Sequence, residues 1–303
     1  MSSSEPIVHP IFEPQTSTWQ YIVADPSTKS AIIIDSVLDF NPATNTLSTT
    51  TADALLSLAA QHEYSIVRIL DTHVHADHLT ASHYLQHRIS QSTGAKPPVC
   101  IGQRIAGVQQ RFAKRYGIPS SEITDVFDHL LGDDEVFSIG DLSAKAIHLP
   151  GHTPDHMGYK IGANVFCGDS LFNTDVGSAR CDFPDGNAHD LYNSVKKLFS
   201  FPDDVKIWTG HDYPPGTEAG RDEPLAYTTV GDQKARNKHL KTGTTEEEFV
   251  TWRQGRDKGL SEPRLLHQSL QFNIRAGRLP AITEAGDRLL HVPLKITGEL
   301  AKM

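Results

Sequence analysis

The chain is poor in cysteine and has no long hydrophobic run. Its three cysteines, Cys100, Cys167 and Cys181, have no CxxC spacing, so they predict free thiols in a reducing compartment rather than a disulfide framework. No apolar stretch approaches the roughly 18–20 residues that a membrane helix needs. The first residues form neither a basic segment followed by an apolar one nor an arginine-rich presequence. We therefore expect a cytoplasmic protein without a membrane partner.

Positive charge is also scarce, because 28 lysines and arginines stand against 37 aspartates and glutamates, a net charge of −9. Nucleic-acid binding requires a basic face, so we expect no nucleic-acid partner. The hydrophobic content is 38% of 303 residues, which is enough for one large domain or for one domain with an appendage.

Strands and helices are predicted to alternate along most of the chain. Apolar runs bounded by turn residues predict strands, and apolar residues at helical spacing predict helices. The predicted strands cover residues 19–24, 30–35, 66–70, 99–101, 135–137, 142–149, 157–161, 165–167 and 205–208, and the predicted helices cover residues 51–62, 79–90, 103–116, 191–199 and 246–258. Beyond Tyr213 the chain is more polar and rich in loops. We predict a catalytic domain at 8–215 and a C-terminal extension at 216–303 packed on it.

The densest chemical signal is an HxHxDH motif at residues 73–78, directly after a predicted strand. It consists of His73, His75, Asp77 and His78, and imidazoles and carboxylates so close together suit a divalent first-row metal. Loops at strand ends are where α/β proteins place their sites. Three further candidate ligands follow the ends of predicted strands downstream: His152, Asp169 and His211. The sequence therefore predicts a metal active site.

Spacing alone leaves two arrangements open for this metal. In the first, all of these side chains hold a pair of metals bridged by Asp169, and a hydroxide attacks an ester, amide or thioester. In the second, two histidines and one carboxylate hold a single Fe(II) ion, with open positions for dioxygen and substrate. The same residues serve both arrangements.

The order of the motifs HxHxDH, GH, GD and GH resembles that of the metallo-β-lactamase superfamily. Within this superfamily the chain is similar to the persulfide dioxygenases, also called sulfur dioxygenases, of the bacterial and fungal branch with a longer C-terminal part. The resemblance covers residues 8–294, and its most specific segment is Ala179-Arg180-Cys181-Asp182-Phe183-Pro184. It implies an α/β fold with αββα layers and a metal site at the edge between two sheets.

The resemblance also implies an activity and a set of site residues. One Fe(II) ion per chain would have three ligands, which are His73, His152 and Asp169. The remaining motif residues would surround these ligands or form a vestigial second site, namely His75, Asp77, His78 and His211. The implied reaction converts glutathione persulfide, dioxygen and water to sulfite and glutathione, and Arg180 would pair with a substrate carboxylate. The alternative is a two-zinc hydrolase of the same fold, acting on a lactone, lactam or glutathione thioester.

Three features leave their roles open at this stage. After Pro154, the resembled family more often has small residues, whereas Asp155 and His156 add a charge and an imidazole near the metal. They could alter substrate choice, or His156 could hydrogen-bond beside the ligands. Cys181 is predicted to be a small buried hydrophobe rather than a sulfur-handling thiol. The polar C-terminal region could cover the site, support a homodimer, or do both.

Overall fold

A computed structural model describes residues 5–216 and 221–298 of the chain. Two six-stranded sheets have the orders β1-β2-β3-β6-β8-β9 and β10-β11-β12-β13-β14-β15, and a small third sheet has the order β5-β4-β7. The strands are β1 (Ile7–Glu13), β2 (Thr18–Ala24), β3 (Ser30–Ile34), β4 (Val37–Asn41), β5 (Thr46–Ser48), β6 (Ser65–Leu70), β7 (Leu79–Thr80), β8 (Val99–Gly102), β9 (His129–Leu131), β10 (Val136–Ile139), β11 (Leu142–His148), β12 (Met157–Ile161), β13 (Asn164–Phe166), β14 (Lys206–Trp208) and β15 (Tyr227–Thr229).

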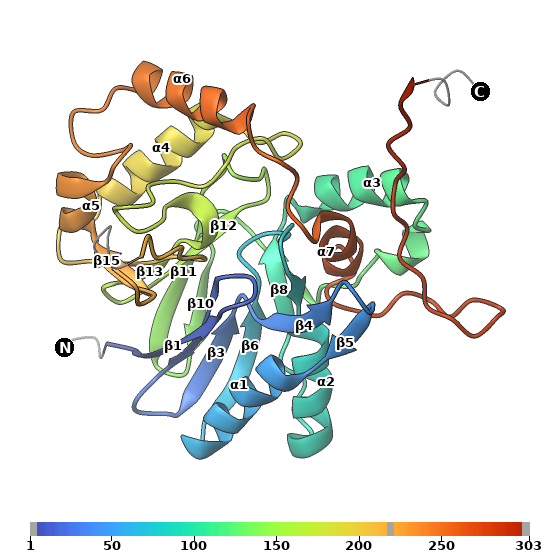
Figure 1. Cartoon of the computed structure of the whole chain (residues 1–303). Coiled ribbons are helices and arrows are strands. Elements are labelled where there is room, and N and C mark those ends of the chain that lie inside the picture. The colour runs from blue at the N-terminus through green and yellow to red at the C-terminus, as the bar shows by residue number, and fades with distance from the viewer. Residues whose placement is uncertain (1–4, 217–220, 299–303) are drawn as a thin grey trace.

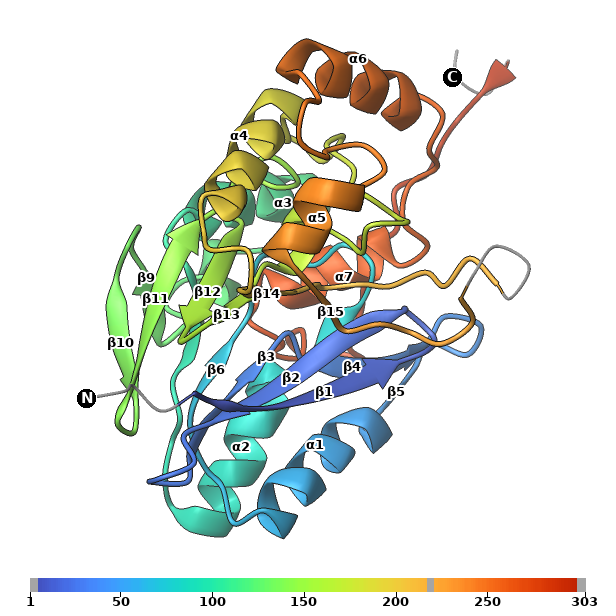
Figure 2. The ribbon, with the colours of Figure 1, turned by 90° about the vertical axis from the view of Figure 1, so that its left-hand side faces the viewer.

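Helices cover the outer face of each large sheet, so the layers run helix, sheet, sheet, helix (Figure 1, Figure 2). Residues of α1, α2, α3 and α7 pack on the first sheet, and residues of α4, α5 and α6 pack on the second. The predicted αββα sandwich is confirmed. The helices are α1 (Thr50–Gln61), α2 (Ser82–Thr93), α3 (Ile105–Tyr116), η1 (Ser120–Glu122), η2 (Gly168–Ser170), α4 (Ala188–Phe199), α5 (Val230–Arg236), α6 (Glu246–Asp257) and α7 (Leu266–Asn273).

The first sheet is apolar on both faces because it lies between helices and the second sheet. Successive side chains of a strand point to opposite faces. Ile22 and Ile33 therefore pack toward the helices, whereas Val23 and Ile32 pack between the two sheets. A strand covered on both faces reads as a continuous hydrophobic run, which is what the sequence shows at residues 31–34.

One predicted helix, at residues 79–90, is wrong at its start. Leu79 and Thr80 form β7 and pair with Leu38 and Val37 of β4. The helix α2 begins only at Ser82 and continues to Thr93. Pairing with a strand about forty residues away competes with the helical spacing, and a sequence pattern confined to one segment does not contain that partner.

The C-terminal region contains more regular structure than its loop-rich sequence indicates. The strand β15 pairs with β14 and completes the second sheet, and α7 packs beside β7 of the small sheet. These elements are only three to eight residues long, too short for a clear hydrophobic period. The domain boundary at residue 215 stays a prediction. Among the described residues, no helix is both long and apolar enough to cross a membrane.

Candidate metal centre

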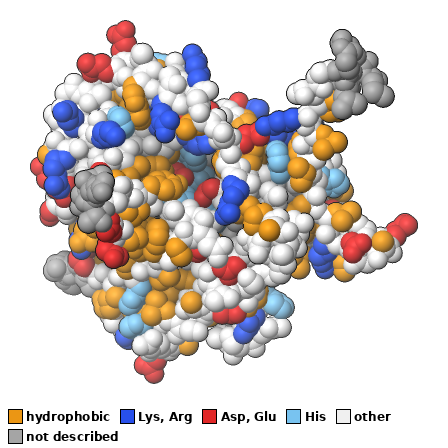
Figure 3. All heavy atoms as spheres, in the orientation of Figure 1, with side chains coloured by type: hydrophobic (Ala, Val, Ile, Leu, Met, Phe, Trp, Pro, Cys, Tyr) orange, Lys and Arg blue, Asp and Glu red, His pale blue; other side chains and the backbone are white. Residues whose placement is uncertain are grey.

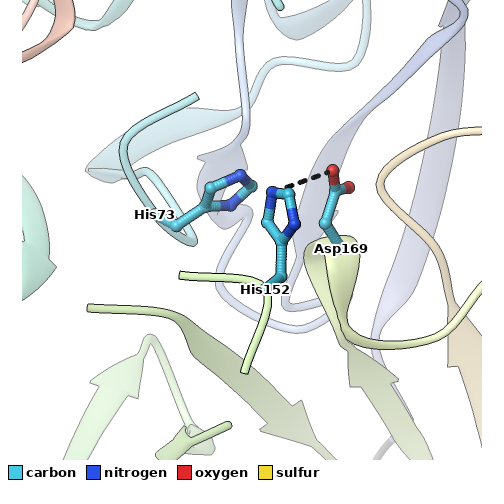
Figure 4. Close-up of side chains that lie close together, drawn as sticks. All are labelled: His73, His152 and Asp169. Atoms are coloured by element: carbon cyan, nitrogen blue, oxygen red, sulfur yellow. Dashed lines mark ion pairs between the residues drawn. The ribbon is translucent and has the colours of Figure 1, made fainter. Parts of the chain in front are cut away.

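The candidate metal ligands lie in loops at one edge of the sandwich. His73 follows β6, His152 lies in the loop between β11 and β12, and Asp169 lies in η2 after β13. One ligand atom from each of these side chains lies within 4.8 Å of the other two. Figure 4 shows His152 between His73 and Asp169, with a dashed line joining His152 to the carboxylate. The fold therefore joins two imidazoles from different sheets with one carboxylate.

The three side chains have the orientation and the unsatisfied atoms expected of a metal site. The Nε2 of His152 lies 3.7 Å from the Oδ2 of Asp169, and the rings of His73 and His152 are 5.0 Å apart at 87°. The Nε2 of His73 and the Oδ1 of Asp169 are buried without a hydrogen-bond partner among the described residues. Buried polar atoms are otherwise almost always paired. Two histidines and one carboxylate form the facial set that suits Fe(II), so these residues fit a divalent metal.

A backbone carbonyl determines the tautomer of His152. Its Nδ1 lies 2.7 Å from the carbonyl oxygen of Arg180, which can only accept a hydrogen bond. The proton of the neutral imidazole must therefore sit on Nδ1. This leaves the lone pair of Nε2, the atom nearest Asp169, free to bind a metal.

A relay of hydrogen bonds orients His73 in the same way. The Thr72 hydroxyl donates to the Asp35 carboxylate at 2.9 Å, and it lies 3.0 Å from the Nδ1 of His73. Because the single hydroxyl proton goes to Asp35, the Nδ1 of His73 must be the donor to Thr72. The Nε2 of His73 is then the ligand atom. Asp35 and Thr72 are not among the site residues expected from the sequence, although an aspartate directly after an apolar strand was an available signal.

His75 lies outside the three-residue cluster, and its Nε2 faces Asp35. Its Nε2 lies 3.1 Å from the Oδ1 of Asp35, and both side chains are buried. Burial opposes the charge on His75, but the Asp35 carboxylate outweighs it and raises the pKa of His75 to about 9. Burial also works against the charge on Asp35, and His75 together with hydrogen bonds from Thr72 lowers the pKa of that carboxyl overall. The Nδ1 of His75 is buried without a hydrogen-bond partner among the described residues, and so is the Nε2 of His78.

The other motif residues form a second polar cluster beside Asp169. The Nε2 of His211 lies 3.2 Å from the Oδ2 of Asp77 and 3.5 Å from the Oδ2 of Asp169. The Nδ1 of His78 lies 3.3 Å from the same Asp77 oxygen. Despite burial, the pKa of Asp77 is lowered by the neighbouring His211 and His78. The ligand atoms of His75, Asp77 and His78 also lie within 4.8 Å of one another. This cluster provides donors of the kind a second metal needs.

Asp155 and His156 both lie in the interior, with no exposed surface. The Asp155 Oδ2 accepts from the backbone N–H of Val74 at 3.0 Å. The Nε2 of His156 accepts from the backbone N–H of Asp169 at 2.9 Å. Burial raises the pKa of Asp155 and lowers that of His156, because it disfavours the charged form of each side chain. Of the two roles left open by the sequence, this placement favours hydrogen bonding beside the ligands.

Arg180 contributes its backbone to the cluster and its side chain to a neighbouring pair. Its Nε and Nη2 donate to the two carboxylate oxygens of Asp182, and its Nη1 donates to the carbonyl of Ser261. An arginine has five N–H donors. Two of them are therefore not used by these contacts. The neighbouring Cys181 is buried in the hydrophobic cluster under α4 and α6, and burial raises the pKa of its thiol.

Asn273, the last residue of α7, connects the C-terminal region to the ligand loop. Its side-chain amide donates to the carbonyls of His75 and His78, both at 2.8 Å, and accepts from the N–H of Thr80. The asparagine is buried and almost two hundred residues away from this loop in the sequence. Nothing in a single sequence distinguishes it from a surface asparagine, so sequence reasoning missed it.

His152 and Asp169 each keep a small exposed surface, whereas His73 is almost fully buried. Figure 3 shows histidine and acidic side chains within a hollow near the centre of this face, with hydrophobic side chains beside it. The rings of Phe172 and Tyr213 pack around His211 at centroid distances of 6.2 and 6.0 Å. Tyr213 is half exposed, so it can contribute an aromatic wall where solvent meets the polar cluster.

Comparison with known proteins gives a consistent family. The sequence profile of the metallo-beta-lactamase superfamily matches residues 14–211, more than half of the chain. The crystal structure of ETHE1 from Myxococcus xanthus superposes with a TM-score of 0.70 and 27% identity, covering 90% of this chain and 100% of that one.

Curated relatives carry names of two kinds. The beta-lactamase hydrolase-like protein of Xylella fastidiosa is 42% identical over 95% of this chain, and the chain spans only 65% of that relative's length. Glyoxylase B2 of Dictyostelium discoideum is 41% identical over 93% of this chain and 94% of its own length. The mitochondrial persulfide dioxygenase ETHE1 of Bos taurus is 26% identical over 91% of each chain.

Proposed function

This chain belongs to the metallo-beta-lactamase superfamily, and we propose that within it the chain is a persulfide dioxygenase. Its substrates are glutathione persulfide, dioxygen and water, and its products are sulfite and glutathione. The observation that carries the proposal is the separation of His75 from the cluster of His73, His152 and Asp169. That separation leaves two imidazoles and one carboxylate, the ligand set of mononuclear iron oxygenases.

Similarity to two ETHE1 proteins supports this choice over other activities of the superfamily. The bovine relative is named a persulfide dioxygenase, and the Myxococcus protein shares the fold over nine tenths of this chain. The identities are 26% and 27%, lower than those of the hydrolase-named relatives. The proposal therefore depends on the ligand geometry first and on the similarity second.

The metal would be one Fe(II) ion held by the Nε2 atoms of His73 and His152 and by the Asp169 carboxylate. When bound, such an ion would bring dioxygen and the terminal sulfur of the persulfide together and would promote the transfer of electrons between them. In the balanced reaction, the sulfur–sulfur bond breaks, the terminal sulfur is oxidised to sulfite and dioxygen is reduced. One dioxygen and one water molecule provide the oxygen atoms of sulfite, and the glutathione thiolate leaves with a proton.

The residues of the chain orient the ligands and the substrate in this reaction. The Arg180 carbonyl and the Thr72–Asp35 relay hold the two histidines with Nε2 directed to the metal. The two unused N–H donors of Arg180 would bind a glutathione carboxylate and aim the persulfide at the metal. His75 pairs with Asp35 through Nε2 and lies outside the cluster of His73, His152 and Asp169, so it would contribute no ligand atom to this iron.

The second candidate is a two-metal hydrolase, and one specific observation favours it. Asp77, His78 and His211 remain together, and Asp169 is close enough to His211 to bridge two metals. The name of the Xylella relative, a beta-lactamase hydrolase-like protein that is 42% identical, also points to hydrolysis. A glutathione thioester would be the corresponding substrate class.

One experiment separates the two candidates. Protein purified without oxygen is analysed for metals, and oxygen uptake and sulfite formation are then measured with glutathione persulfide. We expect about one iron per chain and one dioxygen consumed per sulfite formed. Two zinc ions per chain, thioester hydrolysis and no oxygen uptake would refute the dioxygenase and support the hydrolase.

A further inference from the structure

We infer that His156 is a positioning residue of the metal centre. It holds the candidate ligands Asp169 and His73 at fixed positions relative to each other. This inference rests on the metal centre of the proposed function, but it does not depend on whether the bound metal oxidises or hydrolyses. It assigns a function to one of the two residues after Pro154 whose roles the sequence left open.

His156 contacts both ligands without facing the substrate. Its Nε2 accepts the backbone N–H of Asp169 at 2.9 Å. Its ring lies against the ring of His73, with centroids 4.7 Å apart and planes at 23°. The His156 side chain is fully buried, so it has no exposed surface for contact with a substrate. One imidazole thus joins a carboxylate ligand after β13 to a histidine ligand after β6.

The hydrogen bond determines the tautomer of His156 and excludes it as a metal ligand. Since Nε2 accepts a backbone proton, it carries none of its own, and the ring proton lies on Nδ1. That proton faces the Ser170 hydroxyl at 3.4 Å. Both ring nitrogens are therefore directed at the turn that carries Asp169. Among the described residues, His156 is also the one acceptor recorded for the buried N–H of Asp169.

The space around this contact is closed. Gly168 has φ of +47°, and a Cβ there would lie 2.9 Å from the His156 Nε2 and 2.6 Å from the Thr72 hydroxyl. Asp155 joins the same assembly, because its carboxylate accepts the N–H of Val74, the residue after His73. The loop at residues 152–156 is therefore bonded to both neighbouring ligand loops. A change at His156 should move the ligands rather than only a local side chain.

The test compares Gln and Asn at this position. The side-chain carbonyl of Gln reaches about as far as the imidazole Nε2, so His156→Gln keeps an acceptor for the Asp169 N–H, whereas the shorter His156→Asn does not. His156→Phe keeps a flat ring but no acceptor. Affinity for Zn²⁺ is measured on metal-free protein by competition with a chromophoric chelator, and visible absorption of the Co²⁺ form reports ligand geometry. We expect His156→Asn and His156→Phe to lose ~10–100-fold in affinity, as is typical for partners of metal ligands, and His156→Gln to recover most of it.

His148→Phe is the matched control. His148 is a half-buried histidine whose Nε2 bonds to the Pro154 carbonyl at 3.1 Å, next to the same loop but with no recorded contact to a ligand. The His148→Phe variant should bind Zn²⁺ and Co²⁺ as the parent does, with an unchanged Co²⁺ spectrum. Thermal unfolding of every metal-free variant separates ligand positioning from general stability.

Several outcomes decide the inference. Parent-like affinity and spectrum in His156→Phe would overturn it, and so would a lower unfolding temperature without weaker metal binding. If His156→Phe does not fold, the Gln and Asn variants suffice, because equal affinities for the two would overturn it. If the parent protein bound neither Zn²⁺ nor Co²⁺, the proposed function would be overturned as well. Parent-like metal binding in the variants would overturn the inference about His156 alone.

Discussion

The Nε2 of His75 lies 3.1 Å from the Oδ1 of Asp35, and this second histidine of the HxHxDH motif lies outside the three-ligand cluster. The same Asp35 carboxylate accepts the hydroxyl and the backbone N–H of Thr72. One aspartate therefore pairs with the Nε2 of one motif histidine and, through Thr72, orients the Nε2 of another, His73.

The metal content of variants should reflect this separation. His75→Gln retains a side-chain N–H for Asp35, so we expect it to keep the metal content of the parent. His152→Ala removes a ligand and should lose most of the metal. Both proteins are purified without oxygen and analysed by mass spectrometry of the metals. Equal loss of metal in the two variants would show that His75 is a ligand after all.

Stability of the metal-free protein should fall as the pH rises through the titration of His75. The pKa of this histidine is about 9 in the folded protein against an ordinary value of 6.5, because of Asp35. A raised folded pKa contributes stability that is complete below pH 6.5 and disappears as the pH passes 9. The loss amounts to roughly 3 kcal/mol, from a pKa difference of about 2.5 at 1.36 kcal/mol per pKa unit.

Urea unfolding between pH 7 and 10 measures this contribution. His75→Gln has no titrating group at the position, so its free energy of unfolding should change less over this range. Parallel curves for the parent and His75→Gln would contradict a raised pKa for His75.

Asn273→Leu should destabilise the protein by roughly 2–4 kcal/mol, because it leaves the N–H of Thr80 and two carbonyls of the ligand loop without their partner. The control is Ser269→Ala in the same helix, where a buried hydroxyl has no hydrogen-bond partner among the described residues. That change should cost little or stabilise. Chemical unfolding measures both variants, and similar losses in the two would argue against a specific role for Asn273.

Arg180→Met should raise the KM for glutathione persulfide far more than it lowers kcat. A charge-assisted hydrogen bond contributes about 1.5–3 kcal/mol, which corresponds to ~10–100-fold in kcat/KM. Steady-state oxygen uptake is compared with that for an alkyl persulfide that has no carboxylate, for which the variant should equal the parent. An equal loss with both substrates would mean that the arginine acts only through Asp182 and Ser261.

Much of the secondary structure and the place of the site could be predicted locally. The buried strands are short apolar runs, and each candidate ligand stands just after such a run, so their convergence follows from the edge that strand ends share. The errors lie where long-range contacts decide. Residues 79–80 pair with β4 instead of starting a helix, and β15 is too short to be recognised without β14 beside it.

The sequence by itself determined the chemistry available to this protein: a metal motif at a strand end and the positions of the candidate ligands, with the αββα fold implied by resemblance to a known superfamily. Only the tertiary structure decided how each side chain is used. The partner of His75 is forty residues away, that of Asn273 almost two hundred, and that of Asp169 is an imidazole in another loop. Hydrogen bonds act over about 3 Å in space, whatever the separation along the chain. A motif therefore provides candidate ligands, and the folded surroundings select among them.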